Sequence, residues 1–199
     1  MPSIDREEPG RRFSAEERRE LLGVARASIE NGLRTGMPLV VDPRRFSALL
    51  QSPGASFVTL RIGGRLRGCI GSVEAVRPLV HDVAVNAFNA AFRDPRFPPL
   101  TPDEYPLLDV HISVLSPVEP LPVRSEQELL QVIRPGIDGL ILQYGPHRGL
   151  LLPAVWEELP DPQTFVRHVK LKAGLPADFW APGIQAFRFT TESFGEGEA

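Results

Sequence analysis

Alternation of apolar and polar residues marks the first strands that we expect along the chain. Residues 57–62 alternate and are rich in β-branched side chains, and residues 109–115 alternate with three apolar side chains on one side. Such alternation is typical of a strand that buries one face. Shorter apolar runs predict three further strands, at residues 140–143, 150–152 and 184–191.

Helix start signals lie between these runs. Ser14 and Glu17 form a capping box, and the helix that they open is expected to end near Glu30 at an Asn-Gly pair. An apolar stripe of helical period follows Pro78 and predicts a second long helix. Further N-cap signals predict helices that begin at about residues 42, 101, 125 and 161.

Helices and hairpins follow one another without the regular spacing of βαβ units. This order predicts an α+β fold, in which a mainly antiparallel sheet is flanked by helices. A chain of 199 residues suits one domain, or two closely packed lobes. We expect this domain to cover residues 13–199, after a flexible arm at residues 1–12.

Composition narrows the classes of function. The formal net charge is −3 and the arginines form no basic stripe, so no nucleic-acid partner is expected. No apolar stretch approaches the roughly 18 residues of a membrane span, and the polar N-terminus lacks the apolar core of a secretory signal. The single cysteine cannot form an intramolecular disulfide, which favours the reducing cytoplasm. The sequence also lacks the paired Cys or His spacing of a metal site, so no cofactor is expected.

A glycine pair at residues 63–64 separates the first alternating run from a second one, which contains the only cysteine. A Gly-Gly pair between two strands predicts a two-residue hairpin turn. The simplest register gives three opposed pairs: Ile62 with Arg65, Leu60 with Arg67, and Val58 with Cys69. The two arginines and the cysteine would then project from one face of the sheet.

Two interpretations of Cys69 are open at this point. A nearby guanidinium favours the thiolate, so Cys69 is a candidate nucleophile with Arg67 beside it and Arg65 as a ligand contact. Gly68 and Gly71 would let a ligand or partner approach the backbone closely. The alternative is a buried structural cysteine, which is the commoner role of a lone cysteine.

A proline-bounded loop at residues 94–99 is the second candidate site. Asp94 and Arg96 could hold a ligand or clamp the strand of Cys69, and both interpretations are open. Asn86, on the preceding helix, could point toward the same site or lie on the helix surface. The four histidines stand at no recognisable catalytic spacing and are expected in structural or surface roles: His81, His111, His147 and His168.

The hexapeptide Leu-Arg-Gly-Cys-Ile-Gly at residues 66–71 resembles the hallmark of the AMMECR family. The likeness continues in order at residues 77–79, 90–97, 113–117, 149–153 and 172–176, and it spans about residues 14–194. The chain departs from the family pattern at Ala154, where the family commonly has glutamine. It also lacks the second cysteine that the family often carries before residue 172, which argues against a mechanism with two thiols.

The resemblance implies a compact α+β fold with a larger and a smaller lobe and a cleft near the hexapeptide. In prokaryotes such chains resemble protein A of the AmmeMemoRadiSam system, whose companions are a Memo-like protein and a radical-SAM protein. The resemblance therefore predicts a partner-dependent component of a modification pathway. The alternative is a stand-alone enzyme in which Cys69 is the nucleophile and Arg67 binds a small anionic substrate.

Overall fold

The chain forms two compact units in a computed structural model that describes residues 11–197. One unit contains the residues up to 114 together with those from 192 onward, and the other contains residues 115–191. All but the last two residues of the arm expected at 1–12 lie outside the described residues. A single domain over residues 13–199 stays a prediction.

The first unit is built on a four-stranded sheet with the strand order β2-β1-β3-β8. The alternation at residues 57–62 and 109–115 becomes β1 and β3, which pair in antiparallel register. Their apolar side chains at Val58, Leu60, Val110 and Ile112 are fully buried in the core. The strands of this sheet are β1 (Ser56–Ile62), β2 (Arg65–Gly71), β3 (Leu108–Leu115) and β8 (Thr191–Gly195).

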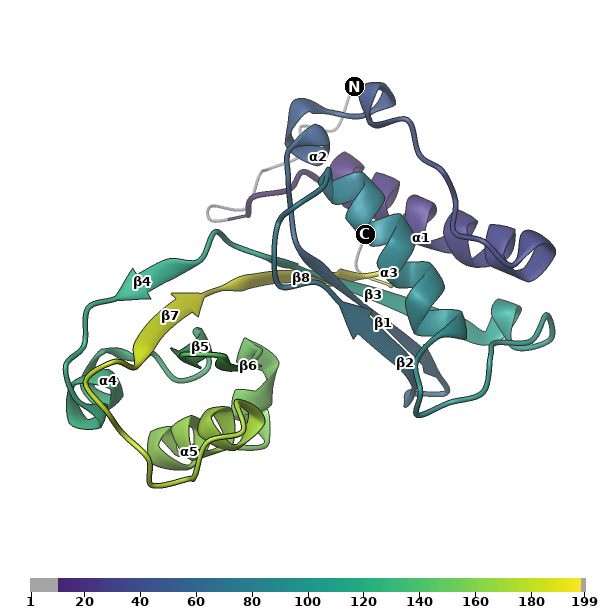
Figure 1. Ribbon diagram of the computed structural model, residues 1–199. Helices are drawn as coiled ribbons and strands as arrows, with labels where there is room; N and C mark the ends of the chain where they lie inside the picture. The colour runs from purple at the N-terminus through teal and green to yellow at the C-terminus, as the bar shows by residue number, and fades with distance from the viewer. Residues whose placement is uncertain (1–10, 198–199) are drawn as a thin grey trace. The chain divides into compact units, whose positions relative to one another are not determined.

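One side of this sheet is covered by helices (Figure 1), namely α1 (Ala15–Thr35), α2 (Ala48–Gln51) and α3 (Leu79–Phe92). The capping box predicted for α1 is present, because Ser14 and Glu17 exchange both hydrogen bonds. The predicted end near Glu30 is wrong. The helix continues to Gly36, whose φ of 72° ends it, while Gly32 lies inside the helix facing the rings of α3.

β1 and β2 form the predicted hairpin around the glycines at residues 63–64, whose φ angles are 55° and 76°. A β-bulge then shifts the register of the two strands. Gly68, and not the expected Arg67, therefore lies opposite Leu60. Alternation alone does not show this shift, because a bulge inserts one unpaired residue into a strand without changing its composition.

The bulge changes which residues share a face of the sheet. Ile62 lies opposite Arg65 as predicted, but Cys69 lies opposite Thr59, so the expected pair of Val58 with Cys69 is wrong. Directly opposed residues share a face, and successive residues of a strand alternate between faces. Arg65 and Cys69 therefore project from opposite faces, and the shared face predicted for them is also wrong.

The second unit contains a second antiparallel sheet with the strand order β4-β7-β5-β6. Its strands and helices are β4 (Glu119–Leu121), α4 (Glu126–Val132), β5 (Gly139–Tyr144), β6 (His147–Leu151), α5 (Pro162–Lys172) and β7 (Gln185–Phe189). A 3-10 turn at Pro153–Glu157 brings Trp156 onto Phe165, and the two rings stack with their centroids 3.8 Å apart.

Several predicted elements differ in detail. The strand expected at residues 184–191 is present as β7 and ends at Phe189, and the strand that follows it, β8, belongs to the other sheet. The helix expected from residue 42 to Leu50 is a 3-10 turn, Pro43–Arg45, followed by the short helix α2, and the helix expected from residue 101 is a 3-10 turn, Tyr105–Leu107. The predicted class, α+β with mainly antiparallel sheets and flanking helices, is confirmed.

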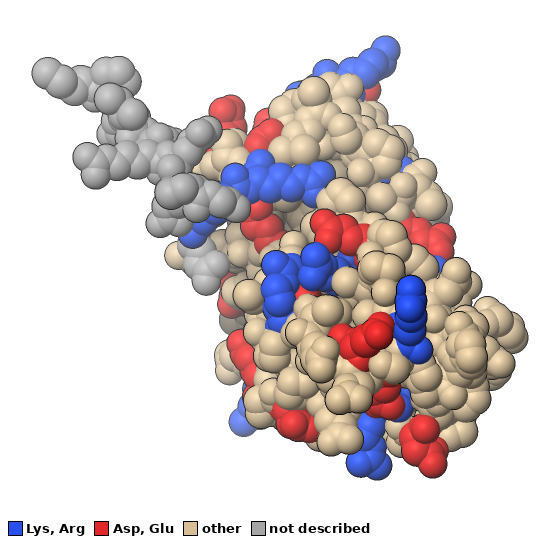
Figure 2. Space-filling view, turned by 90° about the vertical axis from the view of Figure 1, so that its left-hand side faces the viewer, with Lys and Arg blue, Asp and Glu red and all other residues tan. Residues whose placement is uncertain are grey.

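Surface charge and helix hydrophobicity relate to the nucleic-acid and membrane partners that the sequence did not lead us to expect. On the face drawn in Figure 2, Lys and Arg side chains are interspersed with Asp and Glu. The absence of a nucleic-acid partner stays a prediction. Among residues 11–197, no helix combines the length and the apolar character that crossing a bilayer requires.

Candidate functional site

Cys69 lies on the side of the first sheet that α1, α2 and α3 leave uncovered. We call this side the outer face, and it carries the side chains of Phe57, Thr59, Cys69, His111, Ser113 and Ser193. Cys69 is a free, half-buried thiol, and its Sγ lies 3.2 Å from the hydroxyl oxygen of Thr59. The core face at this point is occupied by fully buried Val58 and Leu60. The structural interpretation of Cys69 as a core residue is thus not what the geometry favours.

The two glycines beside Cys69 are required for packing. A Cβ at Gly68 would lie 2.1 Å from the backbone carbonyl oxygen of Ala90, so α3 could not approach β2 as closely with any side chain there. A Cβ at Gly71 would lie 2.2 Å from the ring of Phe57. Protein atoms therefore occupy the space that was predicted to admit a ligand, and a ligand role for these glycines stays a prediction.

Asp94 and Arg96 clamp the backbone of Cys69. β2 is an edge strand, and Asp94 Oδ2 accepts the outward-pointing N–H of Cys69 at 2.9 Å. Arg96 Nη2 donates to the carbonyl oxygen of Cys69 at 3.3 Å and to Asp94 at 2.7 Å. The hydrogen bonds of Arg96, with that of the Cys69 N–H, hold the pKa of Asp94 well below its usual range. The pair thus satisfies the edge of the sheet at the cysteine, as one of the two interpretations of this loop predicted.

Arg67, the predicted partner of Cys69, makes its hydrogen bonds elsewhere. Its Nε donates to Glu104 at 2.8 Å, and its Nη2 donates to Glu104 at 3.0 Å and to the carbonyl oxygen of Pro98 at 2.9 Å. The hydrogen bonds from Arg67 to Glu104, first among the causes, lower the pKa of Glu104 to about 2. The buried Nη1 of Arg67 has no hydrogen-bond partner among the described residues.

One aromatic ring links the two arginines. The guanidinium carbons of Arg67 and Arg96 lie 5.8 Å and 5.6 Å from the centroid of the Phe97 ring, within the range of a cation–π contact. Each guanidinium is also paired with a carboxylate, that of Glu104 or Asp94. The group around Phe97 therefore carries no excess positive charge from these two arginines.

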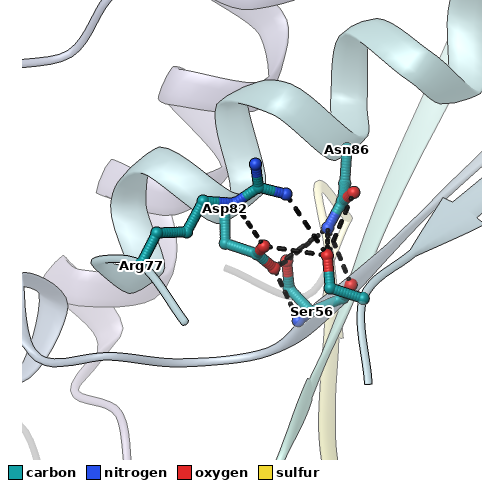
Figure 3. A network of polar contacts seen from close by, with 5 residues as sticks. Ser56, Arg77, Asp82 and Asn86 are labelled. Carbon is teal, nitrogen blue, oxygen red and sulfur yellow. Dashed lines mark hydrogen bonds and ion pairs between the residues drawn. The ribbon is translucent and has the colours of Figure 1, made fainter. Parts of the chain in front are cut away.

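Asn86 lies in a buried network and not on the helix surface (Figure 3). Its amide donates to the Ser56 carbonyl at 3.0 Å and to Asp82 Oδ2 at 2.9 Å. Asp82 is fully buried and also accepts hydrogen bonds from Ser56, Ser72 and Arg77. The network joins α3 to the start of β1 and to the segment after β2, so every donor of the Asn86 amide is directed into protein. A ligand role for Asn86 stays a prediction.

Sequence analysis did not identify the members of this network other than Asn86. One signal was available: Asp82 and Asn86 are four residues apart, on the same stripe as the apolar residues Leu79 and Val83. Polar residues inside an apolar helical stripe indicate buried hydrogen-bond partners.

His111 is the other titratable side chain of the outer face. It lies opposite Thr59 on β3, and Thr59 lies opposite Cys69, so the three residues form one row across the sheet. The His111 Nε2 is 2.9 Å from Asp109 Oδ2, and the ring lies against Gly195 of β8. Adjacent strands are about 4.8 Å apart, which puts the Cα atoms of Cys69 and His111 about 10 Å apart. The Cys69 Sγ contacts the Thr59 hydroxyl and the His111 Nε2 contacts Asp109, so each of the two groups has another partner.

Comparison with known proteins shows which family the chain belongs to. The AMMECR1 family model matches residues 22–194 of the chain. The chain belongs to the AMMECR1 family. The match includes β2, the loop after α3 and both sheets, so the resemblance inferred from the hexapeptide is confirmed.

Archaeal relatives are similar to this AMMECR1-family chain over most of their length. A protein of Methanothermobacter thermautotrophicus is 43% identical over 186 residues, which cover 92% of this chain and 96% of the relative. A protein of Methanocaldococcus jannaschii is 41% identical over 87% of each chain. The crystal structure of an uncharacterized protein from Pyrococcus horikoshii superposes with a TM-score of 0.80 at 36% identity, covering 89% of this chain and 90% of that one.

Of the site residues predicted for this AMMECR1-family chain, the structure brings Cys69, Asp94 and Arg96 into direct contact. Arg67 reaches the same loop through Pro98, whereas Arg65 is exposed near the turn of the hairpin. No group of three or more His, Cys, Asp or Glu side chains arranged for a metal ion occurs in the described part of the chain.

The Arg67–Glu104 ion pair predicts a pH-dependent contribution to stability. Because the pKa of Glu104 is about 2 in the folded chain and higher in the unfolded chain, the pair stabilises the fold above the unfolded pKa. This contribution declines as the pH falls toward 2. Glu104 is 31% exposed, so we expect Glu104→Gln to lower the free energy of unfolding at pH 7 by about 1–2 kcal/mol.

Urea unfolding of both proteins at several pH values between 7 and 2 measures this effect. The difference between wild type and Glu104→Gln should shrink as the pH falls, since the wild-type carboxylate becomes protonated. Asp103→Asn, which neutralises an exposed carboxylate one residue away, is the matched control. A difference that stays constant over this pH range would contradict the assignment.

Proposed function

We propose that this AMMECR1-family protein is a partner-dependent component of a modification pathway and that Cys69 is the group on which its action depends. The partners are a Memo-like protein and a radical-SAM protein, and the compartment is the cytoplasm. The resemblance of the hexapeptide supports the partners, and a single cysteine without a disulfide partner supports the compartment.

The main support for this proposal is the way in which the structure holds Cys69. Cys69 is half-buried on the outer face, while hydrogen bonds fix its backbone N–H and C=O to Asp94 and Arg96. On the opposite face, Gly68 packs closely against the backbone of Ala90 in α3. A reactive group held by a rigid frame is typical of a functional site, because little conformational freedom is lost when it acts.

Alkylation of the native protein tests the proposal, since the chain has one cysteine. We expect iodoacetamide to modify Cys69 completely without denaturant, at a rate within about tenfold of a free thiol, because the side chain is only half buried. Modification that requires unfolding would rule out Cys69 as the acting group.

A second measurement addresses the partners. Cys69→Ser should still bind the purified Memo-like or radical-SAM protein in a co-purification assay, while the modification carried out by the assembled proteins is lost. The control is Ser116→Ala, which deletes a hydroxyl group within the second unit. Absence of any complex with wild-type protein would contradict the partner-dependent role.

The alternative is a stand-alone enzyme with Cys69 as nucleophile and Arg67 as the contact for an anionic substrate. The buried Nη1 of Arg67, which has no hydrogen-bond partner among residues 11–197, favours a ligand that accepts a hydrogen bond there. Against an anion stands Glu104, which neutralises the same guanidinium. If an anion is the substrate, Glu104→Gln should speed the reaction of Cys69 with iodoacetate, because it leaves the positive charge of Arg67 uncompensated.

A further inference from the structure

The outer face differs from an ordinary solvent-facing side of a sheet. The exposed side of an antiparallel sheet is commonly covered by charged side chains such as Lys and Glu. The outer face instead carries a thiol, three hydroxyls, an imidazole and a phenyl ring, contributed by all four strands of the sheet. Charged residues follow one row further along, where Arg61 lies opposite Asp109, and the Asp109 carboxylate reaches back to His111.

Two arginines beside this face are paired with carboxylates, Arg96 with Asp94 and Arg67 with Glu104. Arg61 lies opposite Asp109 on the neighbouring strand, so these two charges are of opposite sign, and the Asp109 carboxylate contacts His111. An anionic ligand would have to give up its hydration for a site without net positive charge, which is unfavourable. A cationic ligand meets the same obstacle.

The two rings of the outer face are placed by glycines. The Phe57 ring lies against Gly71 on β2, and the His111 ring lies against Gly195 on β8, with no side chain beneath either ring. Between the two rings lie the hydroxyls of Thr59 and Ser113, and the latter is 2.7 Å from the Ser193 hydroxyl. Hydroxyls both donate and accept hydrogen bonds, so this part of the outer face suits amide or carbonyl groups.

We propose that the outer face is a ligand-binding site and that its ligand is uncharged and rich in hydrogen-bonding groups, such as a carboxamide or a carbonyl compound. The proposal rests on the proposed function, because it places the ligand beside the thiol of Cys69. It assigns recognition to Thr59, Ser113 and His111, and it makes Arg67 a structural residue of the neighbouring loop.

Two alkylating reagents test this inference on the full chain. Iodoacetamide and iodoacetate share a leaving group and differ in a carboxamide or a carboxylate, and Cys69 is the only thiol that they can modify. We take the alkylation rate with iodoacetamide over that with iodoacetate for the protein, and divide it by the same ratio for N-acetylcysteine. This normalised ratio corrects for the different intrinsic reactivities of the two reagents. We expect this normalised ratio to exceed one by about fivefold, because the carboxylate must be desolvated without a compensating charge.

Variants show whether the outer face is responsible. Thr59→Val, Ser113→Ala and His111→Gln should each lower the normalised ratio by about twofold or more, since each removes a hydrogen-bonding group available to the carboxamide. A change in the nucleophilicity of the thiol would alter both rates equally and leave the ratio unchanged. Thr35→Val, at the exposed end of α1, is the control and should keep the wild-type ratio.

Two outcomes would overturn the inference while the proposed function stands. One is a normalised ratio at or below one, which would indicate an anion site and favour the role of Arg67. The other is a high ratio that all three outer-face variants leave unchanged. Failure of Cys69 to react in the native protein is a different result, because it removes the proposed function and this inference with it.

Discussion

Asp82→Ala should lower the free energy of unfolding by about 3–5 kcal/mol, the range expected when one partner of a buried charge network is removed. Asp82 is fully buried and accepts five hydrogen bonds, from Ser56 N–H and hydroxyl, Ser72, Arg77 and Asn86 (Figure 3). The substitution leaves the N–H of buried Ser56 without its acceptor and opens a cavity beside α3.

Urea unfolding at pH 7 measures this loss. Asp103→Ala removes an exposed carboxylate and should change the free energy of unfolding by less than about 0.5 kcal/mol. Asp82→Asn keeps the shape but loses the charge that Arg77 contacts, so an intermediate loss is expected. A loss below about 1 kcal/mol for Asp82→Ala would show that the network does not join α3 to the sheet as described.

Gly68→Ala should destabilise the fold by about 2–3 kcal/mol, because the core cannot admit the added methyl group without moving a helix. The Cβ would lie 2.1 Å from the carbonyl oxygen of Ala90, and a backbone atom cannot rotate away as a side chain can. We also expect faster alkylation of Cys69, because the displaced strand loosens the clamp of Asp94 and Arg96.

Gly23→Ala is the matched control for this substitution. Gly23 lies inside α1 with nothing within 4 Å of an added Cβ, so alanine should stabilise the helix by about 0.5–1 kcal/mol. Thermal unfolding of the two variants should therefore shift in opposite directions. Equal stability of Gly68→Ala and wild type would contradict the close approach of α3 to β2.

Predictions that depend on neighbouring residues were accurate. The capping box at Ser14, the tight turn at residues 63–64 and the alternation of β3 were all predicted from the sequence and are present. Each depends on backbone preferences and hydrogen bonds within a few residues, so no distant segment is needed to specify it. The family resemblance likewise needed only the hexapeptide and the blocks that follow it.

Predictions that needed a distant partner were less accurate. Arg67 was assigned to Cys69 by spacing, but its guanidinium bonds Glu104, which is 37 residues further along. A bulge moved Cys69 from opposite Val58 to opposite Thr59. His111 had no recognisable catalytic spacing, because its place in the row of Cys69 arises only when β3 pairs with β1.

The sequence by itself therefore determined where α1, α3, α4 and α5 begin, where the hairpin turns, the class of the fold and the family. The tertiary structure alone decided the register of β2, the partners of the arginines, the buried network of Asp82 and the residues that share the outer face. The physical reason is the distance along the chain over which each kind of interaction acts. Capping and turns are specified by local backbone energetics, whereas register and side-chain pairing depend on which distant surfaces pack together and on where a glycine lets them approach.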